Sequence, residues 1–121
     1  MNINDAVRSS QSGTYDETLR KLYPSYDKDP QKYQDRLCTL LETYRSKFDD
    51  PKDIHLFSAP GRIEVGGNHT DHQHGNVLAA AIDRDMVAAA ALNGTDRICV
   101  FSVGFGGLEI DLKDLEPHED E

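Results

Sequence analysis

The residues best suited to chemistry gather in residues 59–71, which read Ala-Pro-Gly-Arg-Ile-Glu-Val-Gly-Gly-Asn-His-Thr-Asp. Pro60 and Gly61 predict a turn after an apolar run, with Arg62 at the exit of that turn. A second glycine pair then precedes a polar set: Asn68, His69, Thr70 and Asp71. Arginine, histidine and aspartate among glycines favour close binding of a polyol or a phosphate. The simpler interpretation of this stretch is a hairpin with a polar tip.

The histidines of this region also raise the possibility of a zinc site. Imidazole and carboxylate groups are zinc ligands, and the segment supplies both types: His69, Asp71, His72 and His74. Their spacing is not that of a helical His-Glu-x-x-His motif, and no other fixed ligand pattern is present. We therefore expect loop histidines and no bound metal, and a metal-binding module stays open as an alternative.

The composition limits the classes of partner. A formal charge of −9 argues against nucleic acid and against anionic membrane surfaces, both of which select basic faces. Cys38 and Cys99 lie far apart, so neither a disulfide framework nor a zinc knuckle is indicated. The polar start lacks the apolar core of a signal peptide, and no run approaches the ~20 apolar residues of a membrane span. The chain is predicted to be soluble and cytoplasmic.

Two helices are predicted in the first part of the chain, after a polar and loosely attached start at residues 1–12. Thr14 and Glu17 form a capping-box pattern that opens a short helix, which Pro24 ends. A second helix begins with Asp29 as N-cap and Pro30 at the first helical position. Its apolar face follows helical spacing: Tyr33, Leu37, Leu40, Leu41, Tyr44 and Phe48.

Strand-like sequence follows Asp50-Pro51. We expect strands at residues 54–59 and 63–65, a strand in the alanine-rich segment up to residue 92, and strands at 98–103 and 108–112. Asn93-Gly94 is a strong hairpin signal, and Gly104, Gly106 and Gly107 mark another turn. The expected fold class is α+β, with N-terminal helices followed by a mixed or antiparallel sheet.

The motif residues at 60–63, 67, 69–71 and 75–78 resemble the galactokinase signature of the GHMP sugar-kinase superfamily. The usual form runs Pro-Gly-Arg-Val-Asn-Leu-Ile-Gly-Glu-His-Thr-Asp-Tyr and, a few residues later, Gly-x-Val-Leu-Pro-x-Ala-Ile. The resemblance covers residues 52–90 well and the remainder weakly. It is specific because the signature fixes residue order, spacing and type together.

The resemblance implies roles for four residues. Arg62 matches the arginine that in galactokinases lies beside the sugar O1 and the γ-phosphate, where a guanidinium stabilises transferred charge. His69 and Asp71 match residues that hydrogen-bond the sugar hydroxyls. Asn68 stands where the family has a sugar-contacting glutamate, and its amide keeps an acceptor oxygen but loses the charge. The resemblance thus favours galactose and leaves the preferred hexose open. Three further positions depart from the pattern: Glu64, Gly66 and His72.

The resemblance implies ATP and Mg²⁺ as cofactors, yet the phosphate-cradling Gly-Leu-Ser-Ser-Ser-Ala loop of the family does not occur in this sequence. The glycine-rich stretch at residues 104–107 lacks its serines and predicts a turn between strands. No nucleotide-binding or metal-binding residue is therefore assigned. We expect the sugar-binding N-terminal part of a galactokinase, inactive by itself. The alternative on the same scaffold is a non-catalytic galactose sensor.

The expected domain organisation follows from this resemblance. Residues 1–121 are predicted to be an incomplete N-terminal GHMP-kinase domain, with residues 1–12 flexible, 13–50 helical, 52–115 forming a sheet with the sugar-site loop, and 116–121 an acidic end. The expected partners are a small sugar and the missing C-terminal part of the same protein. Residues 85–112 are predicted to expose a sheet face or edge, so self-association of the fragment is also expected.

Overall fold

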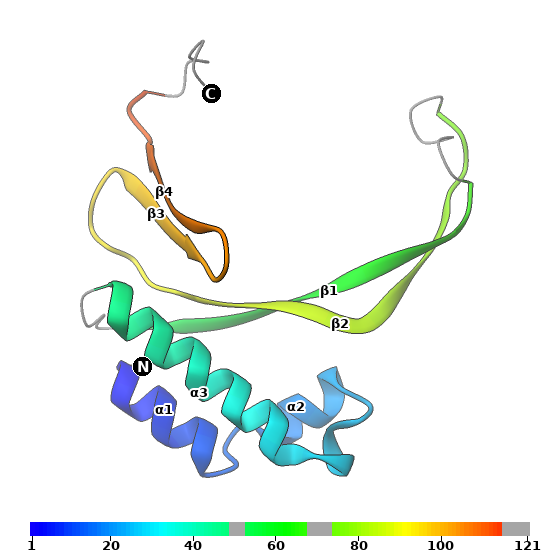
Figure 1. The fold of residues 1–121 in the computed structure, drawn as a ribbon, viewed down its shortest axis with the longest axis horizontal. Coiled ribbons are helices and arrows are strands. Elements are labelled where there is room, and N and C mark those ends of the chain that lie inside the picture. The colour runs from blue at the N-terminus through cyan, green and yellow to red at the C-terminus, as the bar shows by residue number, and fades with distance from the viewer. Residues whose placement is uncertain (49–52, 68–73, 115–121) are drawn as a thin grey trace. The chain divides into compact units, whose positions relative to one another are not determined.

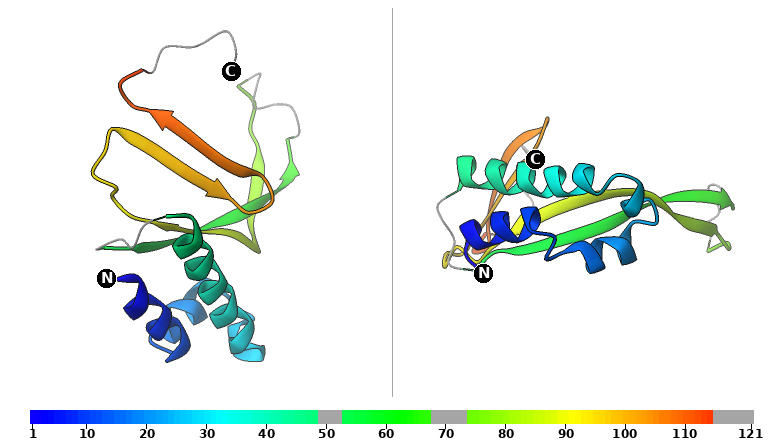
Figure 2. Two further views of the ribbon diagram at one scale, coloured as in Figure 1. Left: turned by 60° about the vertical axis from the view of Figure 1, so that its left-hand side comes forward. Right: turned by 90° about the horizontal axis from the view of Figure 1, so that it is seen from below.

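The computed structural model describes residues 1–48, 53–67 and 74–114. The chain divides into two units, Met1–Ala91 and Leu92–Glu121. The first unit contains α1 (Ile3–Gln11), α2 (Asp16–Leu22), a 3-10 turn η1 (Tyr26–Lys28) and α3 (Pro30–Lys47), followed by the long strands β1 (His55–Gly66) and β2 (Leu78–Ala90) (Figure 1). The helices lie against one part of the β1–β2 hairpin, which extends beyond them (Figure 2).

Helix α1 differs from the loosely attached start that the sequence predicted. The Asn2 side chain caps the helix by accepting a hydrogen bond from the Asp5 amide at 2.9 Å. Ile3 and Ala6 are 1% and 0% exposed, because they pack with Leu41 of α3 and with Ile54. Together with the hydrogen bond from the Ile54 amide to the Met1 carbonyl at 2.8 Å, this apolar face attaches the start of the chain to α3 and to the segment before β1.

Helix α3 confirms the strongest local prediction. It begins at Pro30, and the Asp29 side chain accepts from the Lys32 amide at 3.3 Å. Helix α2 also occurs where predicted, but the capping box is wrong: its N-cap is Tyr15, without a side-chain cap. The Thr14 hydroxyl is instead hydrogen-bonded to the Ser12 hydroxyl at 2.8 Å, so it does not face the helix.

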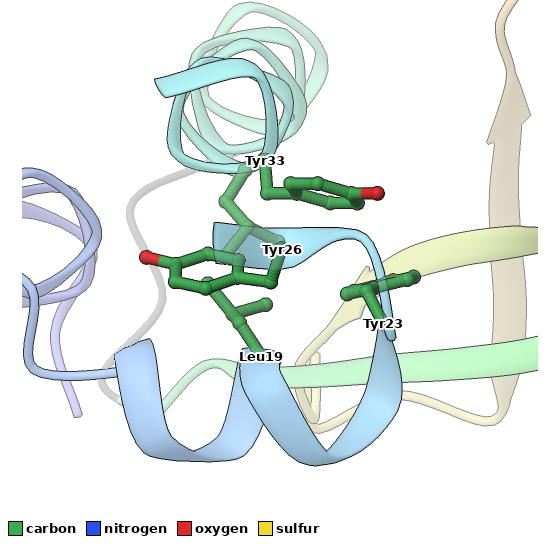
Figure 3. Packing of buried hydrophobic residues seen from close by; sticks show 5 residues of the cluster. Leu19, Tyr23, Tyr26 and Tyr33 are labelled. Atoms are coloured by element: carbon green, nitrogen blue, oxygen red, sulfur yellow. The ribbon is translucent and has the colours of Figure 1, made fainter. Parts of the chain in front are cut away.

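An aromatic cluster joins α2, η1 and α3. The Tyr23 and Tyr33 rings stack with centroids 4.6 Å apart, and Tyr26 is 1% exposed. Figure 3 shows these rings with Leu19 between α2 and the start of α3. Since such rings bury large apolar areas, the cluster supplies much of the core between α2, η1 and α3.

Strands β1 and β2 pair antiparallel from His55–Ala90 to Gly66–Leu78. The predicted turn at Pro60-Gly61 is wrong, because β1 continues through both residues as one strand. The prediction of strand for the alanine-rich segment is confirmed, as that segment forms β2. The hairpin pairing lets alanines of β2 lie opposite larger residues of β1, such as Phe57 opposite Ala88.

The second unit contains β3 (Arg97–Ser102) and β4 (Gly106–Asp111), which also pair antiparallel. The predicted turn between them is confirmed, with Gly104 and Gly106 at φ +87° and +95°. The predicted hairpin at Asn93-Gly94 is wrong, because β2 pairs with β1 and β3 with β4. Asn93 instead closes a loop, its amide donating to the Arg97 carbonyl at 2.9 Å.

Helices followed by antiparallel strand pairs confirm the α+β class for the described residues.

Burial of Leu41 predicts a stability difference between two leucines. Leu41 is fully buried, whereas Leu22 is 51% exposed. Leu41→Ala is expected to lower the free energy of unfolding by about 2–5 kcal/mol, since it leaves a cavity between α1 and α3. The matched control Leu22→Ala should cost about 0.5 kcal/mol or less. Urea unfolding followed by helical circular dichroism checks this, and equal losses for both variants would contradict the observed core.

Candidate functional site

The structure describes one of the four predicted site residues. Arg62 lies on β1, paired with Ala81 of β2. Asn68, His69 and Asp71 lie outside the described residues, in the segment that connects β1 to β2. Their grouping with Arg62 therefore stays a prediction. The polar segment lies between the two strands of a hairpin, as the simpler interpretation expected, and its binding of a polyol or phosphate stays a prediction.

The strand pairing is irregular immediately before Arg62. Pro60 pairs with Asp85 and Arg62 pairs with Ala81, so three residues of β2 lie opposite Gly61 alone. Proline has no N–H to donate to a ladder and is found within sheets mainly at edges and bulges. We call this irregular pairing, formed by residues 60–62 and 81–85, the β1–β2 bulge. Bulges re-aim side chains and are frequent beside active sites.

Gly61 makes the bulge possible through close backbone approach. A Cβ at this position would lie 3.0 Å from the Arg84 carbonyl oxygen and 3.2 Å from Ile82 Cγ1. The contact with backbone cannot be relieved by a side-chain rotation. A larger residue here would have to push the Arg84 backbone away by a few tenths of an ångström, so the close approach favours glycine at position 61.

Arg62 itself is accessible. Its side chain is exposed, and among the residues that the structure describes it has no ion-pair partner. The alternative to a functional role would be a surface salt bridge that involves Arg62. No such ion pair occurs in the described part of the chain. An exposed guanidinium offers planar donors suited to oxygen-rich anions and hydroxyls.

Asp85 joins the bulge to the helices, and the sequence reasoning missed it. Its side chain is 7% exposed and accepts hydrogen bonds from the Tyr23 hydroxyl, from Arg36 Nη1 and, at 2.6 Å, from the Ser58 hydroxyl. Arg36 Nη2 also donates to the Asp85 carbonyl at 2.9 Å. The signal was available: Asp83-Arg84-Asp85 interrupts an otherwise apolar strand, and its two aspartates stand at alternate positions, which favours one face for both.

The contacts of Asp85 hold its pKa below the usual value. Burial by itself would raise the pKa of this carboxyl. The hydrogen bonds from Ser58, Tyr23 and Arg36, together with the positive charge of Arg36, outweigh that effect. The carboxylate is therefore ionised at neutral pH although it is largely removed from water.

The described residues offer no metal centre. Within them, no group of three or more His, Cys, Asp or Glu side chains could hold a metal ion. His74 is exposed with φ +57°, whereas His69, Asp71 and His72 lie outside the described part. The zinc alternative therefore gains no support from the structure.

An open hollow in the second unit lies apart from the motif in sequence and contains none of the predicted site residues. Its lining comes from the open end of the β3–β4 hairpin, where β3 begins and β4 ends: Thr95, Asp96, Arg97, Asp111 and Lys113. Lys113 is paired with Asp96 at 2.8 Å, and Arg97 lies 4.0 Å from Asp111. Because its charges neutralise each other, we assign this hollow no binding role.

Comparison with known proteins identifies the motif. Residues 42–92 match the galactokinase galactose-binding signature. The chain carries a galactokinase signature. It is 33% identical to the galactokinase of Candida parapsilosis over 63% of this chain and 15% of that protein. It is 34% identical to the galactokinase of Lactococcus lactis subsp. cremoris over 70% of this chain and 22% of that protein.

A third relative extends the match along the chain. The galactokinase of Dictyostelium discoideum is 28% identical over 80% of this chain and 21% of its own length. The predicted resemblance to galactokinases is thus confirmed, and the chain spans about a fifth of the curated relatives it matches. No solved structure matches the chain significantly.

The galactokinase signature falls on the elements that form the bulge. It begins within α3, includes β1 and β2, and ends just beyond Ala90. Gly61, Arg62 and Asp85 all lie inside it. Outside it, the glycine-rich stretch at 104–107 belongs to the β3–β4 turn and strand β4, as predicted, and opens no helix in the described residues. No helix of the described ranges is long and apolar enough to cross a membrane.

The close approach at Gly61 predicts a difference between two glycines of β1. Gly61→Ala is expected to lower the free energy of unfolding by about 1–3 kcal/mol, because its methyl group would press against the Arg84 carbonyl and force the bulge to shift. Gly66→Ala is the matched control, since a Cβ there meets nothing within 4 Å. Urea unfolding of both variants checks this. Equal tolerance of the two substitutions would show that the bulge does not need glycine.

The lowered pKa of Asp85 predicts how its contribution to stability depends on pH. A carboxyl with a depressed folded-state pKa stabilises fully above its unfolded value of about 3.9 and loses this effect as pH falls through the folded-state pKa. The stability difference between the wild type and Asp85→Asn should therefore be constant near pH 7 and shrink below about pH 4. Urea unfolding across this range measures it, and a difference that grows on acidification would contradict the ion pair.

Proposed function

We propose that this chain is the N-terminal, sugar-binding portion of a cytoplasmic galactokinase, which transfers the γ-phosphate of ATP to the C1 hydroxyl of galactose. The observation that carries the proposal is the galactose-binding signature at residues 42–92, which contains the exposed Arg62 immediately after the bulge. The GHMP-kinase assignment of the domain is part of the same proposal. It is supported by the α+β order of helices and antiparallel strands.

In this proposal the motif residues divide into two roles. Arg62 lies beside the attacking C1 hydroxyl, where its guanidinium favours loss of the hydroxyl proton and neutralises charge on the transferred phosphoryl group. His69, Asp71 and Asn68 hydrogen-bond the sugar hydroxyls. A carboxylate that accepts from two neighbouring hydroxyls discriminates epimers, because the wrong epimer leaves it unpaired. Asn68 in place of a glutamate makes the sugar preference of this protein a quantity to measure.

The described residues of this chain do not fit a nucleotide site. The glycines at positions 104–107 lie in a tight turn between β3 and β4 and in β4 itself, and no serine-rich loop opens a helix within the described ranges. ATP and Mg²⁺ are therefore assigned to other parts of the full-length protein. This chain contributes the sugar contacts and the arginine, and by itself it is expected to be inactive.

Exposed apolar faces support a further partner, the remainder of the same protein. In the first unit Phe57 and Met86 are 57% and 76% exposed, and in the second unit Phe105 and Leu108 are 93% and 60% exposed. Faces of this kind mark surfaces that are covered by another part of a protein or by a partner. For the chain by itself, the same faces favour self-association.

Removal of the Arg62 guanidinium tests the proposed reaction. In the full-length protein that carries this chain, Arg62→Ala should lower kcat for galactose by about 10²-fold to 10³-fold. The reason is that the transferred phosphoryl oxygens lose the hydrogen bonds and the positive charge of the guanidinium. Arg97→Ala is the control, since Arg97 is an exposed arginine of the second unit paired with Glu109 and Asp111. A coupled assay of ADP release measures both.

Two results would overturn parts of the proposal. Wild-type turnover in Arg62→Ala would remove the role of Arg62 in phosphoryl transfer. A wild-type protein that binds galactose in calorimetry but releases no ADP would be a galactose sensor on the kinase scaffold rather than an enzyme.

A further inference from the structure

Asp85 is the residue through which four elements meet. Its carboxylate accepts from Tyr23 at the end of α2, from Arg36 of α3 and from Ser58 of β1, while Asp85 itself belongs to β2. An ionised carboxylate with 7% side-chain exposure is costly to bury unless its acceptor sites are filled. Three side-chain donors fill them, so the contacts fix the position of Asp85 relative to the helices.

The same residue borders the bulge. The pair Pro60–Asp85 is the last one before the register changes, and the next pair is Arg62–Ala81. Within the bulge, Asp83 accepts from the Ser25 hydroxyl at 3.2 Å, which adds a second contact to the helical part. The β2 side of the bulge is thus held against the helices at two alternate residues, whereas Arg62 begins the regular pairing that follows.

We propose that Asp85 is a positioning residue: by tying the edge of the β1–β2 bulge to Arg36, Tyr23 and Ser58, it fixes the direction in which Arg62 leaves β1. The importance of that direction for phosphoryl transfer rests on the proposed function. Asp85 is also proposed to hold the strand register at the bulge, and this part is independent of the proposed function because it is argued from the contacts of Asp85 alone. Misplacing a catalytic group by about 1 Å lowers turnover about 10²-fold, so a loosened bulge is expected to be visible in kcat.

A double-mutant cycle in the full-length protein tests the kinetic part. Asp85→Asn keeps the shape of the side chain and removes its charge, and we expect kcat for galactose to fall about tenfold. In the Arg62→Ala background the same substitution should change kcat less than about twofold, because the residue through which it acts is gone. Equal losses in both backgrounds would overturn the proposal, since a general loss of stability does not depend on Arg62.

Two further variants make this cycle decisive. Ser58→Ala removes one donor and leaves the ion pair, so it should cause a smaller loss of kcat that is also absent with Arg62→Ala. It replaces Asp85→Asn if that variant does not fold, and the same loss in both backgrounds would then overturn the proposal. Asp27→Asn is the control, because Asp27 pairs with Arg20 at an exposed position and should leave kcat unchanged.

Nuclear magnetic resonance of the 121-residue chain tests the register part without any activity. Asp85→Asn is expected to weaken the cross-strand contacts between Arg62 and Ala81 and to speed exchange of their amide protons, while signals of β3 and β4 stay unchanged. Unaltered contacts between Arg62 and Ala81 would overturn the proposal. If the wild-type protein phosphorylates no galactose, the proposed function fails, and this measurement still decides whether Asp85 holds the bulge.

Discussion

The position of the β1–β2 hairpin depends on a carboxylate that is almost removed from water. Asp85 would be unstable in that place without partners, since the desolvation of one ion exceeds what a single hydrogen bond returns. Tyr23, Arg36 and Ser58 together make the arrangement favourable, and each comes from a different element. Apolar contacts of Ile54, Leu56 and Ala89 with the helices add attraction. They are less directional than the polar contacts of Asp85, which constrain both the distance and the angle between the hairpin and the helices.

The parts of the fold that were predicted correctly are those determined by neighbouring residues. Helix α3 is set by Asp29-Pro30 and an apolar repeat, and the β3–β4 turn is set by glycines with positive φ. The errors arose where distant residues decide. Asn93-Gly94 has the composition of a hairpin turn, yet the strand before it already pairs with β1. The tendency of Asn-Gly to form a tight turn is weaker than the backbone hydrogen bonds that β2 makes with β1 along its length.

The candidate site shows the same division. The order and spacing of the motif indicated the galactokinase relationship without any structure, and the role of Arg62 stays a prediction. The reason for Pro60-Gly61 was misread, because a close approach of two backbones at a bulge leaves the same sequence pattern as a turn. Asp85 was missed for a different reason. Its function lies in contacts with residues 27 to 62 positions away, and no short motif records those contacts.

The local pairing of the strands also bears on the order in which the molecule is assembled. Each described strand pairs with its neighbour along the chain, β1 with β2 and β3 with β4. Contacts between residues close in sequence close short loops and form quickly. On a ribosome, the bulge beside Arg62 can therefore form as soon as β2 has emerged, since α2 and α3 precede it. The first unit can thus take up its strand pairing before β3 and β4 are synthesised.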